Sequence, residues 1–132
     1  MSFTLRQRLI AAILALTLGL AVVVTRCGGG TTSPTGPVVQ VAIADLTFTP
    51  NAITIPRGAT VRWTNTSATE RHNILPVVDG AFKPHDSLIK NGESVSTTFA
   101  KAGDYAYYCS VHGSKTSGQR GVVHVTDPTS GG

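Results

Sequence analysis

The sequence is poor in cysteine and in charged residues, and each shortage excludes a class of protein. Its 132 residues include two cysteines, Cys27 and Cys109, which are too few for a disulfide framework. Charged residues make up 14% of the chain and no run of Lys or Arg occurs, so we predict no nucleic-acid binding. The length suffices for one domain and not for two.

Most of the net positive charge lies near the N-terminus. The formal net charge is +4, but three of the 11 basic residues, Arg6, Arg8 and Arg26, fall within residues 1–26. The remaining eight basic residues face seven acidic ones, so residues 27–132 carry about +1. A balance this close to neutral gives the rest of the chain no strong attraction for polyanions.

Residues 1–26 have the pattern of a secretory signal peptide or a membrane anchor. Arg6 and Arg8 precede an uncharged apolar run from Leu9 to Val24. This run of 16 residues is shorter than the ~20 that span a bilayer comfortably. We therefore expect export to the periplasm or to the outer face of the cytoplasmic membrane.

Cys27 offers a second way to attach the chain to a membrane. It follows the apolar run and precedes three glycines, as the lipid-attachment cysteine of bacterial lipoproteins does. Arg26 is a departure, because lipoproteins have a small residue directly before that cysteine. A lipid anchor at Cys27, an uncleaved anchor through residues 9–24 and free secretion all stay open. We do not expect Cys27 to pair with Cys109, which lies inside the domain.

Three further segments follow the leader. Residues 27–37 form a flexible linker of Gly, Ser, Thr and Pro, residues 38–127 form the folded domain, and residues 128–132 form a disordered tail. Within the domain, short stretches of alternating apolar residues such as Thr60 to Asn65 are separated by turns that contain glycine. This pattern predicts an all-β antiparallel sandwich or barrel. The pattern is weak only from Phe82 to Lys90, where we expect a short helix or a loop.

The most informative stretch of the domain runs from Tyr107 to His112. It places Cys109 and His112 three residues apart, just after an apolar strand, while His72 lies far upstream beside another strand-like run. One thiolate and two imidazoles are the ligand set of a blue-copper electron-transfer site. If these three side chains meet in the fold, the chain carries electrons. Asn73 and Ser110 stand beside them and are placed to hydrogen-bond across the two ligand segments.

The same stretches resemble the small cupredoxins, the group of plastocyanin, amicyanin and pseudoazurin. The resemblance covers residues 48–126 and rests on five segments taken together. These segments are Phe48 to Ile55, Gly58 to Asn65, Arg71 to Asn73, Gly92 to Ser96 and Gly103 to Gly113. It implies a cupredoxin-like Greek-key β-sandwich of about seven to eight strands that binds one type 1 copper through His72, Cys109 and His112. It also implies that Tyr105 ties a loop corner.

The chain departs from this family at the fourth ligand. Cupredoxins usually supply a weak axial methionine after the second histidine, but the one methionine here is Met1. The resemblance places Gln119, followed by Arg120 and Gly121, where the family has Met-x-Gly. Gln119 is therefore the candidate axial ligand, and glutamine is an accepted variant at that position. The alternative is an open axial position with a water or a backbone carbonyl nearby.

Each candidate also has an interpretation without metal. Without metal, Cys109 would be a buried structural thiol. His112 and Gln119 would be exposed loop residues, and His72 would be a solvated turn residue. We do not expect His85 or His124 to be ligands, since His85 has no cysteine partner nearby and His124, which alternates with valines on the last strand, should face solvent.

The combined prediction is an exported, monomeric carrier of one electron and not an enzyme. By resemblance, redox partner proteins dock transiently near His112, which forms an electron port with Val111 and Gly113. Two other functions stay open: a copper-binding or storage module without electron transfer, and a metal-free β-sandwich used for binding. Zinc also fits a site of one cysteine and two histidines.

Overall fold

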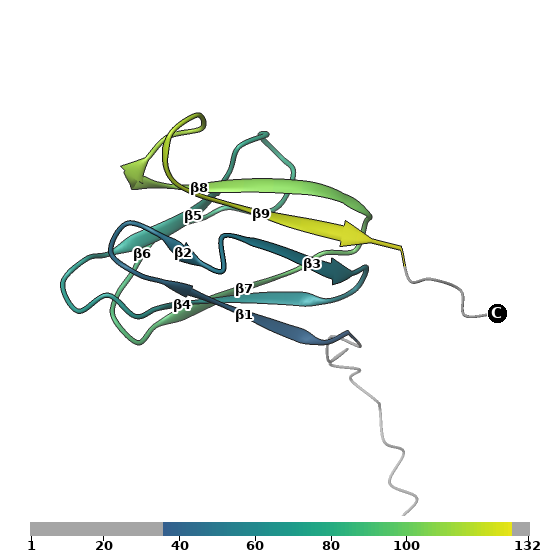
Figure 1. Cartoon of the computed structure of the whole chain (residues 1–132), viewed down its shortest axis with the longest axis horizontal. Helices are drawn as coiled ribbons and strands as arrows, with labels where there is room; N and C mark the ends of the chain where they lie inside the picture. Colours follow the sequence, from purple (N-terminus) through teal and green to yellow (C-terminus); the bar gives the residue numbers. More distant parts are fainter. Residues whose placement is uncertain (1–35, 128–132) are drawn as a thin grey trace, which may run out of the picture. The chain divides into compact units, whose positions relative to one another are not determined.

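The computed structural model describes residues 36–127, which form nine β-strands (Figure 1). In chain order these are β1 (Val38–Ile43), β2 (Phe48–Thr49), β3 (Ala52–Pro56), β4 (Thr60–Asn65), β5 (His72–Pro76), β6 (His85–Ile89), β7 (Ser94–Thr98), β8 (Gly103–Gly113) and β9 (Gly118–Thr126). Among these residues no helix is long and apolar enough to cross a membrane. The predicted leader, lipid-attachment cysteine and tail lie outside the described residues, as does the linker up to residue 35.

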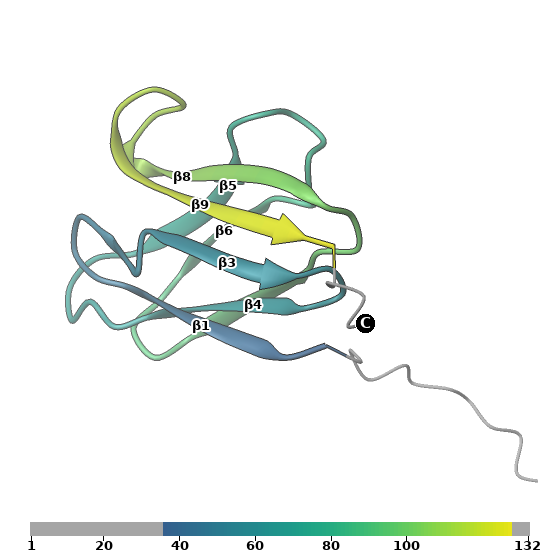
Figure 2. The same cartoon turned by 45° about the vertical axis from the view of Figure 1, so that its right-hand side comes forward.

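The strands form two sheets that pack face to face. One sheet has the order β2-β1-β4-β7 and the other the order β3-β9-β8-β5-β6. Figures 1 and 2 show β8 and β9 in one layer above β1 and β4 in the other. The predicted all-β sandwich is confirmed. Both sheets are mixed, because the β1–β4 and β3–β9 pairs are parallel while the remaining pairs are antiparallel.

The helix or loop expected at residues 82–90 is wrong for most of that segment. Residues His85–Ile89 form β6, which pairs with β5 at the edge of its sheet across an irregular register. Three consecutive residues of β6 are exposed, and Ile89 alone is buried. An edge strand of this kind has no alternation of apolar and polar residues, so the sequence carries no period-two signal there.

The core lies between the sheets and is built from the inward-facing residues of the strands. Trp63 on β4 is fully buried, and its ring packs edge-on against Tyr107 on β8 with centroids 5.3 Å apart. Phe99 is 2% exposed and packs edge-on against Trp63, with ring centroids 6.4 Å apart. Burial raises the pKa of Tyr107 to about 12, which keeps its phenol neutral inside the core.

Strand β8 carries the candidate ligands to one end of the sandwich. Near its start, the hydroxyl of Tyr105 donates to the carbonyl of Lys101 at 2.9 Å, which confirms the predicted tyrosine at a loop corner. Side chains alternate along the strand, so Tyr107 and Cys109 both face the core, 1% and 0% exposed. In both views the end of β8, the start of β9 and the turn after β1 lie at the same end of the molecule.

Candidate metal centre

The structure brings His72, Cys109 and His112 together at that end of the sandwich. His72 is the first residue of β5, and the other two lie near the end of β8. One ligand atom from each residue lies within 4.8 Å of the other two. His72 and Cys109 are fully buried, and the side chain of His112 is 15% exposed. The three donors therefore face one point beneath the surface.

Hydrogen bonds show which ring nitrogens face that point. Nδ1 of His72 lies 3.7 Å from Sγ of Cys109. Nε2 of His112 points the other way, to the Glu70 carboxylate at 3.2 Å. This leaves Nδ1 of His112 buried and without a hydrogen-bond partner. A buried nitrogen without a partner is costly, and a metal bound at that nitrogen would satisfy it. The donor set therefore fits a metal ion.

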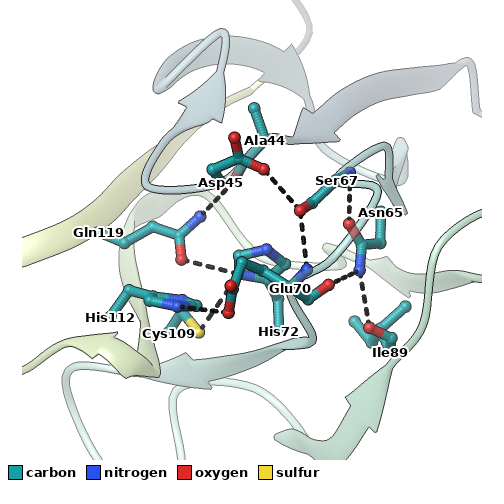
Figure 3. A network of polar contacts seen from close by, with 10 residues as sticks. All are labelled: Ala44, Asp45, Asn65, Ser67, Glu70, His72, Ile89, Cys109, His112 and Gln119. Carbon is teal, nitrogen blue, oxygen red and sulfur yellow. Dashed lines mark hydrogen bonds and ion pairs between the residues drawn. The ribbon is translucent and has the colours of Figure 1, made fainter.

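Gln119 completes the cluster from β9. It is 2% exposed, and its Oε1 lies 3.0 Å from Nδ1 of His72. Its Nε2 donates to the carbonyls of Ala44 and Thr47, both at 3.1 Å. These two bonds fix the orientation of the amide, so that its oxygen and not its nitrogen faces the cluster (Figure 3). Gln119 lies on a strand that the core supports, not on the exposed loop of the alternative interpretation.

A tight hairpin between β8 and β9 holds His112 and Gln119 in register. Gly113 pairs with Gly118 at its base. Gly118 has a φ of 81°, and a Cβ built on it would lie 2.5 Å from the carbonyl oxygen of His112. Glycine alone combines that backbone conformation with such a close approach. Any side chain at position 118 would therefore push the segment that carries His112 away from the segment that carries Gln119.

The surroundings of His72 favour its neutral imidazole. Burial lowers the pKa of His72, and the hydrogen bond to Gln119 only partly opposes this effect. A neutral ring is the form that binds a metal, because a lone pair must be free. Cys109 forms no disulfide within residues 36–127, so its thiol is available as well.

A pair of hydrogen bonds ties the two ligand strands together. Nδ2 of Asn73 donates to Oγ of Ser110 at 2.9 Å, and the backbone nitrogen of Ser110 donates to Oδ1 of Asn73 at 2.9 Å. The contact predicted between these residues is confirmed. Because each residue is next to a candidate ligand, this clamp fixes the separation of His72 and Cys109.

The other two histidines lie outside the cluster and have partners of their own. Nε2 of His85 lies 2.9 Å from the hydroxyl of Thr97. Nδ1 of His124 lies 2.7 Å from the Asp104 carboxylate on the surface of the sandwich. Sequence reasoning missed Glu70, the residue on the outer nitrogen of His112. No local signal identifies it, since 42 positions separate the two residues.

The chemistry of the donor set matches copper more closely than other metals. A soft thiolate, two imidazoles and a weak oxygen donor are the ligands of electron-transfer copper sites. Zinc also accepts thiolate and imidazole, but it has no redox chemistry. The cluster therefore fits a metal that changes its oxidation state.

Comparison with known protein families points the same way. A family model described as copper binding proteins, plastocyanin/azurin family, matches residues 37–126. The chain is similar to a plastocyanin of Scenedesmus fuscus, with 38% identity over 88 residues. That match covers 61% of this chain and 87% of the relative.

Solved structures with a similar fold include an amicyanin mutant and a nitrite reductase. A methionine-to-glutamine mutant of amicyanin, with Cu(I), is 30% identical with a TM-score of 0.58, covering 67% of this chain and 82% of that one. The copper-containing nitrite reductase of Thermus scotoductus is 28% identical with a TM-score of 0.59. That match covers 70% of this chain, which spans only 23% of the length of the reductase chain.

Proposed function

Because the chain belongs to the plastocyanin/azurin family of copper-binding proteins, we propose that it is an exported carrier of single electrons. Its cofactor is copper. The observation that carries the proposal is the convergence of His72, Cys109 and His112 at the rim of the sandwich. Bound copper would supply the one-electron change between Cu(II) and Cu(I).

We propose four ligand atoms for this copper. They would be Nδ1 of His72, Sγ of Cys109 and Nδ1 of His112, with Oε1 of Gln119 as a weaker fourth donor. The thiolate is soft and favours Cu(I), while imidazole accommodates both oxidation states. The set therefore suits a metal that cycles between them.

The scaffold keeps the ligands rigid and excludes water from the site. The core supports Cys109 and Gln119, and the Asn73–Ser110 clamp fixes the two ligand strands. A rigid, buried site changes little when its charge changes, because few water molecules have to reorient. Fast electron exchange requires this property.

The exit route for the electron is proposed to be His112 with its neighbours Val111 and Gly113. Val111 is 49% exposed and places an apolar side chain on the surface next to His112 in sequence. A redox partner protein would dock there through a small, short-lived contact. The chain would work as a monomer in the periplasm or at the outer face of the membrane, tethered through residues 9–24 or Cys27 where a tether is retained.

An enzymatic function is the alternative that the nitrite reductase raises. Copper enzymes with related domains combine several domains and a second metal site. Within residues 36–127, His72, Cys109 and His112 are the single group of side chains arranged to hold a metal. One such site matches an electron carrier better than an oxidoreductase with its own substrate.

Loading the 132-residue chain with Cu(II) tests the proposed function. We expect one copper per chain, an intense visible absorption from charge transfer between thiolate and copper, and reversible reduction. Copper uptake without reversible electrochemistry would favour a storage module. A purified chain that takes up no copper would favour a metal-free binding domain. Metal analysis belongs beside the spectrum, since zinc fits the same donors.

Replacing Gln119 with methionine tests the axial ligand. We expect Gln119→Met to raise the reduction potential by about 60 mV or more, because an amide oxygen favours Cu(II) and a thioether favours Cu(I). A tenfold change in their relative affinities corresponds to about 59 mV for one electron. Voltammetry of the copper-loaded chain measures the shift. Gln119→Leu is the control for simple loss of the amide, and a potential that stays or falls in Gln119→Met would remove Gln119 from the site.

A further inference from the structure

The outer ring nitrogen of His112 is covered by a carboxylate instead of facing solvent. Oε2 of Glu70 lies 3.2 Å from Nε2 of His112, and the side chains of these residues are 45% and 15% exposed. If Nδ1 of His112 holds the metal, Nε2 carries the ring proton and donates a hydrogen bond to the Glu70 carboxylate. Figure 3 shows the side chain of Glu70 reaching from its loop toward the ring of His112.

The loop that carries Glu70 is held at several points. Nδ2 of Asn65 donates to the Glu70 carbonyl at 2.9 Å, and Oγ of Ser67 accepts from the Glu70 backbone nitrogen at 3.0 Å. Ser67 in turn donates to the Asp45 carboxylate at 2.6 Å. Asn65 is fully buried and Ser67 is 3% exposed. The backbone of Glu70 is therefore fixed before any metal binds, and its carboxylate needs little reordering to reach His112.

We propose that Glu70 is a positioning residue that holds His112 through its outer nitrogen and lowers the reduction potential of the bound copper. This inference rests on the proposed function. It adds to the site one residue, Glu70, that is not itself a ligand of the metal.

Two physical effects follow from the contact. A histidine that donates to a carboxylate is a more basic ligand, and the negative charge adds to the field at the metal. Both effects favour the more highly charged ion, Cu(II) over Cu(I). The hydrogen bond also restrains the ring in both oxidation states, so the His112 imidazole moves less when an electron arrives.

Two substitutions in the copper-loaded chain of 132 residues separate the effect of charge from that of hydrogen bonding. Glu70→Gln removes the charge but keeps an oxygen that accepts from Nε2, while Glu70→Ala removes both. We expect each variant to favour Cu(I) by about tenfold relative to the parent, a rise of ~59 mV in potential. In Glu70→Ala we also expect a 10- to 100-fold loss of Cu(II) affinity, the usual effect of losing such a partner.

A matched control exists on the same strand as Cys109. Asp104 also places a carboxylate on a histidine, His124, and lies roughly 17 Å along β8 from Cys109 by strand rise. Asp104→Asn removes the same unit of charge and should change the Cu(II)/Cu(I) preference less than twofold. In the metal-free chain, the proton on Nε2 of His112 should exchange slowly with water and should exchange faster in Glu70→Ala, as NMR would show.

The outcomes separate this inference from the proposed function. A parent that is coloured and reversibly reduced, with Glu70 variants of unchanged potential, would overturn the role of Glu70 alone. An equal shift in Asp104→Asn would also overturn it, because the effect would then be one of net charge. A parent without charge-transfer absorption would overturn the proposed function and this inference with it. Because Glu70 is a half-exposed side chain on a backbone held by other residues, both variants should fold, which far-UV circular dichroism checks.

Discussion

Cys109→Ser should abolish the intense visible absorption of the copper-loaded chain. That absorption requires a thiolate bound to the metal, and Cys109 is the one cysteine among residues 36–127. Serine has nearly the same shape, so the sandwich should survive a buried hydroxyl at a cost of about 1–3 kcal/mol. The affinity for copper should fall by more than the ~10- to 100-fold typical of losing a residue that merely supports a ligand. Absorption spectra and metal titrations of parent and variant measure both effects.

The matched control for Cys109→Ser removes a histidine, a side chain that can also bind metal, from a position outside the cluster. His124 is half-exposed and lies outside the cluster, paired with Asp104. His124→Ala should therefore retain the colour and copper affinity of the parent. If Cys109→Ser instead takes up copper and gives the optical bands of the parent, the sulfur is not a ligand and the site lies elsewhere.

Much of the fold could be predicted because the strands of a sandwich bury alternate residues. Val41 and Ile43 on β1 and Val61 and Trp63 on β4 are all nearly or fully buried, as their spacing of two predicts. The number and pairing of strands were harder to predict. Strand β2 has two residues, too short for any alternation, and the parallel pairing of β1 with β4 depends on contacts between distant segments.

The site was predictable where its residues form a local pattern. Cys109 and His112 lie three positions apart, and His72 precedes Asn73, whose partner Ser110 follows the cysteine. Type and spacing suggested the ligand set, and the resemblance of five segments to the small cupredoxins implied that the three residues meet. The orientation of the rings was not predictable, because it depends on hydrogen bonds to partners on other strands.

The burial of Gln119 and the contact made by Glu70 show what a single sequence does not contain. Gln119 follows a polar run, Ser114 to Gly118, yet it is buried because two backbone carbonyls beyond β1 accept both of its amide protons. Glu70 lies in a charged stretch typical of a solvated turn, yet it contacts a candidate ligand 42 residues away. Both roles arise only when the two sheets close on each other.

Asn65 is the residue whose loss should cost the fold most at this end of the sandwich. Its fully buried side chain donates to the carbonyls of Glu70 and Ile89 at 2.9 and 2.8 Å and accepts from the Ser67 nitrogen at 2.8 Å. Asn65→Ala leaves three backbone groups without partners, each at a cost of about 1–3 kcal/mol. We expect a loss of about 3–5 kcal/mol, a large part of the ~5–15 kcal/mol typical of a domain. Urea unfolding of the metal-free chain should show a lower midpoint with an unchanged slope.

Two further variants show whether this cost comes from the network of Asn65. Thr66→Val removes a single bond, from the neighbouring hydroxyl to the Ile43 carbonyl, and should cost no more than about 1 kcal/mol. Asn65→Asp keeps the acceptor for Ser67 but places an oxygen against two carbonyls, so it should destabilise at least as much as Asn65→Ala. Because Asn65 also fixes the Glu70 backbone, copper-loaded Asn65→Ala should show the rise in potential expected of Glu70→Ala. An Asn65→Ala chain as stable as the parent would contradict the argument, since the loop would then be held without it.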